Sequence, residues 1–315
     1  MPLTQFGKHK FIYVWQIGSM HKMDILHILQ IVLFYLFIKQ NQSTSDYLMN
    51  VVNSNKMNKP FDFITSSFAA NLSDTYSISV RQLPDGYIFY ITDNNNQGVA
   101  IKHITAEHIT AQTLKNEPLL QLNYCSVAYI GYGPFALIPK SLIIDENYAT
   151  FLPIENNLRR RAKSIVNPLT DDIIITAYAN QWTMPDTKCR KCHEVELLAS
   201  VALSASTANS MWAEITSQHI NIVVIKDHKL HLANSFPITC DNDAAYYILA
   251  CYQQLDLSQE NTPLTIIGDL AHINPTPFLK DYIRHIEPLK PHTWSSELPN
   301  EYTSLLALQT YTLEK

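Results

Sequence analysis

The stretch YSISVRQLPDGYIFYI, residues 76–91, decides the fold class of this chain. Its first part alternates between apolar and polar residues up to Val80, and its last part is the β-prone run from Tyr87 to Ile91. Between them, Asp85-Gly86 is a dipeptide that is typical of tight β-hairpin turns. We therefore predict an antiparallel hairpin here, as the start of a sheet.

Apolar runs continue this pattern along the chain. A third strand is predicted at 98–104, followed by a helix at 105–116 that Thr105 opens. Further strands are predicted at 126–130, 135–138, 173–177, 220–225, 230–235 and 263–267, and further helices at 193–213, 241–254 and from 276 onward. The same order of elements thus occurs near 76–150 and again near 220–287.

This repetition predicts an α/β protein that is built from two similar lobes. We place the first lobe at 57–190 and the second at 191–315. Two such lobes facing each other leave a crevice between them, which is the default position for a ligand.

Residues 1–56 form an extension before the first lobe. It contains an apolar segment, 25–38, whose length suits a signal-peptide core or an interfacial helix better than a membrane span. A polar linker follows at 40–59. Three interpretations stay open: a membrane anchor, a cleaved signal, or a stretch upstream of a later start at Met49 or Met57.

Net charge, cysteine spacing and glycine content argue against several classes of function. The formal net charge is −5 and the one basic run, 159–163, is short, so we expect no nucleic-acid partner. The five cysteines are irregularly spaced, which favours reduced thiols in a reducing, cytoplasmic compartment. Only seven residues are glycine, and the sequence contains neither a P-loop nor a dinucleotide-binding glycine motif.

Three stretches resemble a bacterial family of uncharacterised function. They are the hairpin from Ile78 to Phe89, the run FALIPKSL at 135–142, and LANSF at 232–236 with DAAYYIL at 243–249. The resemblance covers roughly residues 60–290. It implies an actin-like ATPase fold of the Hsp70 and sugar-kinase type, with two tandem ribonuclease-H-like lobes. In that wider group ATP lies between the lobes, and each of two phosphate-binding hairpins has an acidic residue followed by glycine and Ser or Thr.

The resemblance implies candidate crevice residues at two hairpins and one loop. The first hairpin reads Arg81 to Gly86 and the second reads Lys226 to Lys229, and both depart from the group pattern. The segment 267–269 resembles the loop that packs on adenosine, with one glycine instead of two or more. The candidate residues are Arg81, Asp85, Lys226, Asp227, Gly268 and Asp269. Because both hairpins lack the pattern, we expect no ATP or magnesium cofactor.

One short motif suggests a different chemistry. CRKCH at 189–193 has the spacing of a c-type haem attachment site, in which two thiols bind haem and the histidine binds iron. The motif occurs once, and it precedes a predicted helix in a chain whose core the other segments already explain. We expect neither haem nor zinc at Cys189, Cys192 and His193, since zinc would need a fourth ligand.

These observations favour a non-enzymatic actin-like protein that binds a protein or a small molecule and has no catalytic residues. Two alternatives stay open. A divergent ATPase or kinase would hold its nucleotide with Arg81 or Lys226. A membrane-tethered scaffold of a pilus or secretion assembly would use residues 25–38 as its anchor.

Overall fold

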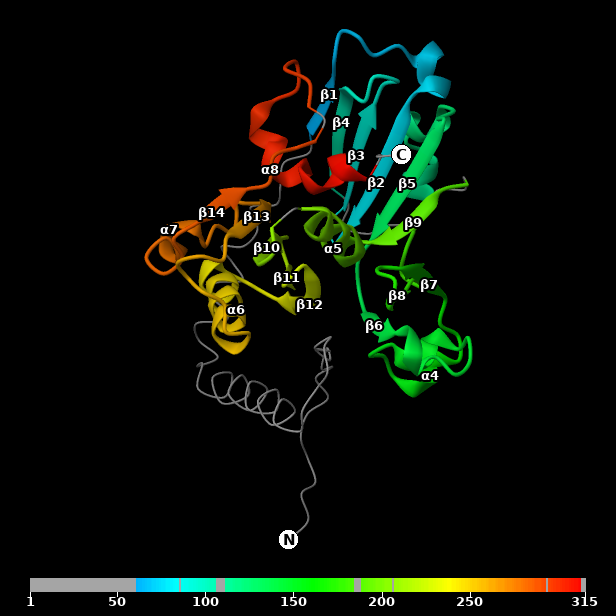
Figure 1. Ribbon diagram of the computed structural model, residues 1–315. Helices are drawn as coiled ribbons and strands as arrows, with labels where there is room; N and C mark the ends of the chain where they lie inside the picture. The colour runs from blue at the N-terminus through cyan, green and yellow to red at the C-terminus, as the bar shows by residue number, and fades with distance from the viewer. Residues whose placement is uncertain are drawn as a thin grey trace, which may run out of the picture.

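The computed structural model describes residues 61–312 except 85, 106–110, 184–187, 206 and 293. The described strands form sheets of six, five and three strands (Figure 1). The predicted extension at 1–56 lies outside the described residues, and so do Asp85 and the first part of the helix predicted at 105–116. Within the described ranges, no helix combines the length and the apolar character that crossing a membrane requires.

The first sheet contains the hairpin predicted from residues 76–91. Its strand order is β1-β4-β3-β2-β5-β9. β2 and β3 pair antiparallel from Ser77 opposite Thr92 to Leu83 opposite Gly86, which confirms the hairpin. Gly86 is required at this turn because a Cβ atom there would lie 2.0 Å from the carbonyl oxygen of Ile104. The bounds are β1 Phe61–Ile64, β2 Ser77–Leu83, β3 Gly86–Thr92, β4 Gly98–Thr105, β5 Ser126–Gly131 and β9 Arg190–His193.

The second sheet repeats this arrangement. Its order is β12-β11-β10-β13-β14, in which three antiparallel strands are followed by two parallel ones, as in the first sheet without its outer strand β1. β10 therefore takes the place that β2 has in the first sheet, and the predicted pair of similar lobes is confirmed. The bounds are β10 Ser210–Ile215, β11 His219–Lys226, β12 Lys229–Pro237, β13 Leu264–Gly268 and β14 Ile286–Pro288.

The segment 193–213, predicted as one helix, is a helix followed by a strand. α5 spans Glu194–Ser204, and β10 begins at Ser210 after a short polar stretch. β10 is the central strand of the second sheet, with β11 on one side and β13 on the other. Pairing with two neighbours thus outweighs the helical pattern of the local sequence.

The helix predicted from residue 276 onward is also shorter than expected. α7 covers only Thr276–Leu279, and β14 then pairs in parallel with β13. The other described helices are α3 Ala111–Lys115, α4 Asn156–Arg159, α6 Asp241–Gln254 and α8 Thr303–Leu306. α6 has the bounds that the sequence predicts.

A small three-stranded sheet is inserted between β5 and β9. Its order is β6-β8-β7, with bounds β6 Phe135–Pro139, β7 Ser164–Pro168 and β8 Ile173–Tyr178. Together with α4 it forms a green unit that stands apart from the two larger sheets in Figure 1. Among the described residues, both outer strands of this sheet, β6 and β7, have one edge without a neighbouring strand.

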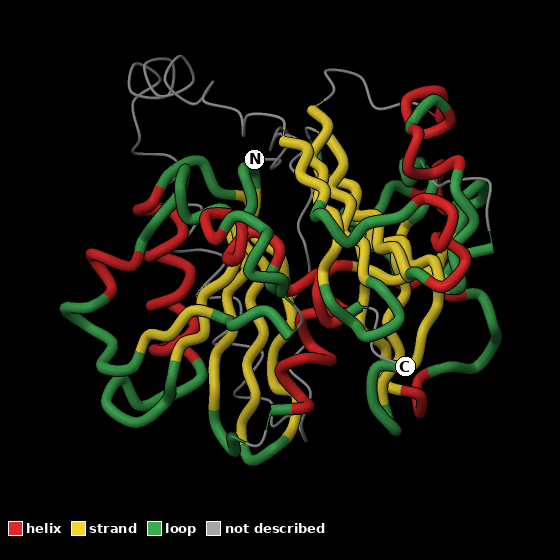
Figure 2. The backbone as a smooth tube through the Cα atoms, turned by 90° about the horizontal axis from the view of Figure 1, so that it is seen from above, coloured by secondary structure: helices red, strands yellow, loops and turns green. Residues whose placement is uncertain are grey.

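One hydrophobic core connects the two large sheets. Val80 and Phe89 of the first sheet belong to the same buried cluster as Leu198 of α5 and Val223 of the second sheet. α5 follows β9 of the first sheet directly and packs on β11 and β12 of the second. The two groups of strands lie side by side in the view from above, with helical segments between them (Figure 2).

The C-terminal segment returns to the first lobe. Residues 298–306 pack in a buried cluster with side chains of β1, β3 and β4. Gln309 donates hydrogen bonds through Nε2 to the carbonyl oxygens of Ser79 (2.9 Å) and Ile88 (3.2 Å). The division predicted after residue 190 differs from this arrangement, because β9 completes the first sheet and the C-terminal segment contacts both lobes.

Candidate functional site

The hairpins of the two lobes can be matched because the sheets share one strand order. The turn between β2 and β3 has its equivalent in the turn between β10 and β11, which is residues 216–218. The second phosphate hairpin was expected at 226–229, but that turn joins β11 to β12. The predicted hairpin therefore lies at the opposite end of β11 from the turn 216–218. The reason is that no strand was predicted at the position of β10.

Lys226 and Asp227 accordingly lie far from the first lobe's hairpin. Lys226 donates from Nζ to the Leu255 carbonyl oxygen (3.1 Å), and the Asp227 amide donates to Oδ1 of Asn209 (2.9 Å). Lys226 and His219 are the two ends of the eight-residue strand β11, which makes them roughly 23 Å apart. These two predicted residues take no part in a site between the lobes.

Gly268 and Asp269 lie at the end of β13 that faces the interlobe region. Gly268 has φ +108°, and a Cβ atom there would lie 2.0 Å from the Ile215 carbonyl oxygen. The Asp269 amide donates to that same oxygen (3.0 Å), and its carboxylate pairs with Nδ1 of His272 at 2.6 Å. Gly268 thus allows β13 to approach β10 closely, and the Asp269 amide stabilises this contact.

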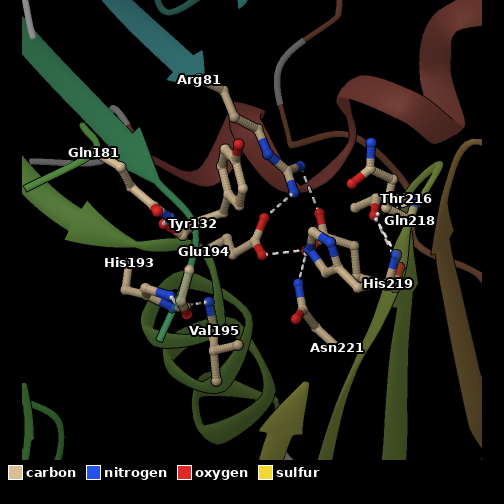
Figure 3. A network of polar contacts seen from close by, with 12 residues as sticks. Arg81, Tyr132, Gln181, His193, Glu194, Val195, Thr216, Gln218, His219 and Asn221 are labelled. Atoms are coloured by element: carbon tan, nitrogen blue, oxygen red, sulfur yellow. Dashed lines mark hydrogen bonds and ion pairs between the residues drawn. The ribbon is translucent and has the colours of Figure 1, made fainter. Parts of the chain in front are cut away.

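Arg81 is the predicted residue that reaches across to the second lobe. Its Nη1 lies 2.5 Å from Oε1 of Glu214 on β10, and its Nη2 lies 2.9 Å from Oε2 of Glu194 at the start of α5. The three side chains are 1–3% exposed. We call this group the interlobe ion bridge, because one guanidinium from the first sheet holds a carboxylate from each of two elements around it (Figure 3).

The remaining carboxylate oxygens of the interlobe ion bridge also have partners. Oε1 of Glu194 lies 2.5 Å from Nε2 of His219, and Oε2 of Glu214 accepts from Nδ2 of Asn221 at 3.0 Å. The ring of Tyr132 stacks on His219, with 6.1 Å between ring centres. All four carboxylate oxygens are therefore bonded, which is what two buried charges require.

The start of α5 fixes the position of Glu194 for its contacts with Arg81 and His219. His193 is the N-cap residue, and its Nδ1 accepts from the Val195 amide at 3.1 Å. Glu196 completes a capping box by accepting from the His193 amide at 3.2 Å. Glu194 therefore lies in the first turn of a fixed helix, where a negative charge is favoured by the helix dipole.

The same cap argues against haem at CRKCH. Nε2 of His193 lies 3.0 Å from the Gly133 carbonyl oxygen, so both ring nitrogens have partners. Cys192 is 1% exposed within the core that joins the lobes. Binding of haem would require this core to open, so these residues do not fit that cofactor.

The charges of the interlobe ion bridge stabilise one another. Burial opposes ionisation of Glu194, but His219 and Arg81 outweigh it and hold its pKa well below the usual range. Burial likewise disfavours the charged form of Arg81, yet Glu214 and Glu194 raise its pKa above the ordinary value. For His193 burial is the largest effect; Glu194 and the Gly133 carbonyl oxygen offset it only in part, so its pKa falls to about 4.

Sequence reasoning found Arg81 and missed its partners. Glu194 stood next to the haem-like motif, and Glu214 directly followed the segment 193–213 that was predicted to be helical. One available signal was Glu214 itself, a lone carboxylate in the apolar run SMWAEI. A buried charge in a strand requires a buried partner, which would have directed attention to Arg81.

A model of a protein family of unknown function, DUF3822, matches residues 65–286. The chain belongs to this family. No curated protein matches the sequence of this DUF3822 member.

Solved structures resemble this DUF3822 chain over most of its length. A Bacteroides thetaiotaomicron protein with an actin-like ATPase fold and unknown function is 20% identical, with a TM-score of 0.58 over 79% of this chain and 100% of the other. The PilM-PilN type IV pilus biogenesis complex is 9% identical, with a TM-score of 0.46 over 74% and 95%. The ethanolamine utilization protein EutJ from Carboxydothermus hydrogenoformans is 9% identical, with a TM-score of 0.39 over 74% and 89%. The first of these confirms the actin-like ATPase fold.

Proposed function

We propose that this chain is a catalytically inactive binding protein in which the interlobe ion bridge takes the place of a nucleotide. The observation that carries the proposal is the position of Arg81 between Glu194 and Glu214. These groups lie where the two lobes meet, near the carboxyl ends of the matched strands β2 and β10. That end of an α/β sheet is the usual place for a ligand.

The charge of this region disfavours phosphate. Two buried carboxylates face a single guanidinium, and both terminal nitrogens of that guanidinium already have carboxylate partners. A nucleotide would bring further negative charge to a space with little water to screen it. Repulsion between like charges is strong under these conditions.

The turn at 216–218, beside the ion bridge, uses backbone amides for its own hydrogen bonds. Oγ1 of Thr216 accepts hydrogen bonds from the amides of Gln218 (3.4 Å) and His219 (3.1 Å). The amide of Thr216 donates to the His219 carbonyl oxygen (2.9 Å). Phosphate-binding turns depend on amides that point outward, and here the amides of Thr216, Gln218 and His219 bond within the turn instead.

The ATPase alternative needs a cation that reaches the phosphates. Arg81 already forms ion pairs with two carboxylates, and Lys226 lies at the end of β11 that is away from the interlobe ion bridge. These positions favour the inactive binding protein over the divergent ATPase.

Calorimetric titration with millimolar Mg-ATP, combined with an assay of phosphate release, tests the proposal. We expect neither binding heat nor turnover. Micromolar binding with turnover would overturn it. Arg81→Ala and Lys226→Ala form a matched pair for any binding that is seen, because each removes one cation: Arg81 lies in the interlobe ion bridge, and Lys226 lies at the far end of β11.

A further inference from the structure

The small sheet carries a cavity that the interlobe ion bridge does not use. Its volume is about 250 Å³, and it contacts all five residues of β6. Leu142, the segment 150–153 and Arg159 also line it. We call this space the β6 groove.

The β6 groove runs along the edge of a strand. Neighbouring residues in a strand point to opposite faces, and those of β6 do so: Phe135 and Leu137 join the main core, whereas Ala136 and Ile138 join a separate small cluster. A cavity that contacts all of them therefore follows the strand's edge. β6 is an outer strand of its sheet, and among the described residues no backbone hydrogen bond outside the strand ladders involves 135–138.

The walls of the β6 groove combine apolar surface with one unpaired cation. Leu142 and Phe151 are 49% and 36% exposed, although both are large apolar side chains. The Arg159 side chain is half-buried, and its Nε is buried without a hydrogen-bond partner among the described residues. A half-buried guanidinium without a carboxylate gains most from an anionic partner.

We propose that the β6 groove binds an extended segment of a partner protein, which pairs with β6 as an added strand and places an Asp or Glu on Arg159. An exposed strand edge supplies main-chain hydrogen bonds, and alternate side chains of the peptide contact Leu142 and Phe151. A small molecule fits less well, since pockets that enclose a drug-sized ligand begin at about 300 Å³. The inference is independent of the absence of nucleotide between the lobes.

A phage library of random octapeptides, panned on the full chain, tests this inference. We expect enrichment of peptides with apolar residues at alternate positions and an acidic residue at a fixed place. Arg159→Glu should lower the affinity of a selected synthetic peptide at least about tenfold, and panning on this variant should select a basic residue instead.

Two further variants separate the β6 groove from general effects of charge. Thr150→Trp adds bulk at an exposed position that lines the groove, and it should abolish binding. Arg160→Glu makes the same charge change as Arg159→Glu at an exposed neighbour that does not line the groove, and it should leave binding unchanged. A peptide with methylated backbone nitrogens should bind at least about tenfold more weakly, because it cannot pair with a strand.

Several results would overturn the inference. One is that no peptide is enriched on the wild-type chain. Another is that Arg159→Glu and Thr150→Trp bind the selected peptides as tightly as the wild-type chain does. A third is that the methylated peptide binds as tightly as the unmethylated one. Stabilisation by a small carboxylate such as octanoate, without any enrichment of peptides, would assign the β6 groove to a different ligand and would also overturn it.

Discussion

Arg81 lies between the two large sheets and Arg159 lies in the small inserted unit, and the surroundings of the two arginines are opposite. Arg81 is 3% exposed and has a carboxylate on each terminal nitrogen. Arg159 is half-buried beside apolar side chains, and its Nε has no partner among the described residues. The difference teaches that a buried charge with complete internal pairing belongs to the structure. A cation left unpaired at an open edge is the better place to look for a ligand.

The strongest test of this comparison removes the Arg81 cation. Arg81→Met leaves Glu194 and Glu214 buried without their partner, so the free energy of unfolding should fall by about 3–5 kcal/mol. Urea denaturation followed by circular dichroism measures the change. Adding Glu194→Gln and Glu214→Gln to the same chain should restore a large part of the loss, since the unpaired charges are then gone. A loss below about 1 kcal/mol for Arg81→Met would show that the bridge is not a structural element.

Low pH should weaken the interlobe region through His193. Its pKa falls from 6.5 in the unfolded chain to about 4 in the folded one, so the unfolded state binds the proton first. Stability is therefore complete above pH 6.5 and declines as the pH falls towards 4, by about 3 kcal/mol in total. Glu194 contributes no loss until the pH falls below its ordinary value of 4.5, because its folded pKa is lowered.

Urea denaturation at a series of pH values checks this prediction. His193→Asn keeps a residue that can cap α5, and it should flatten the dependence between pH 6.5 and 4.5. An equally steep dependence in this variant would assign the proton uptake to another group.

A divalent cation should partly replace the guanidinium. Arg81→Ala leaves two facing carboxylates, and oxygen ligands of this kind suit Ca²⁺. Millimolar Ca²⁺ should stabilise the variant by about 1 kcal/mol and leave the wild type unchanged, as thermal unfolding would show. An equal response of both proteins would mean that the cation binds elsewhere.

The smallest effect is expected at the β6 groove. Arg159→Ala removes a cation that has no hydrogen-bonded partner at Nε, so its free energy of unfolding should change by less than about 0.5 kcal/mol. Arg160→Ala, at the exposed neighbouring position, is the matched control. A cost of several kcal/mol for Arg159→Ala would place this residue with Arg81 as a structural group and would remove the contrast between them.

The fold could be predicted from short-range patterns, whereas most of the site could not. The Asp85-Gly86 turn and the runs on either side specify a hairpin locally, and β2 and β3 form it. β10 was missed because its apolar residues follow a helix closely, and only pairing with β11 and β13 makes it a strand. That error also moved the second phosphate hairpin to residues 226–229.

The ion bridge brings together residues that are distant in the sequence. Arg81 and Glu194 are separated by 113 positions, and Arg81 and Glu214 by 133. No local pattern encodes such a contact, since it depends on how the two sheets pack around α5. The β6 groove could not be predicted either. The sequence contains Leu142 and Phe151, but only the structure shows that both are exposed and that β6 is an outer strand.

The most direct test of the central claim is thermal unfolding of the wild-type chain with and without millimolar Mg-ATP. A nucleotide that bound the native state would raise the unfolding temperature, because a ligand stabilises the state to which it binds. If the interlobe ion bridge occupies the place of a nucleotide, the unfolding temperature should be the same in both solutions. A reproducible increase with Mg-ATP that Arg81→Ala abolishes and Lys226→Ala preserves would contradict the account.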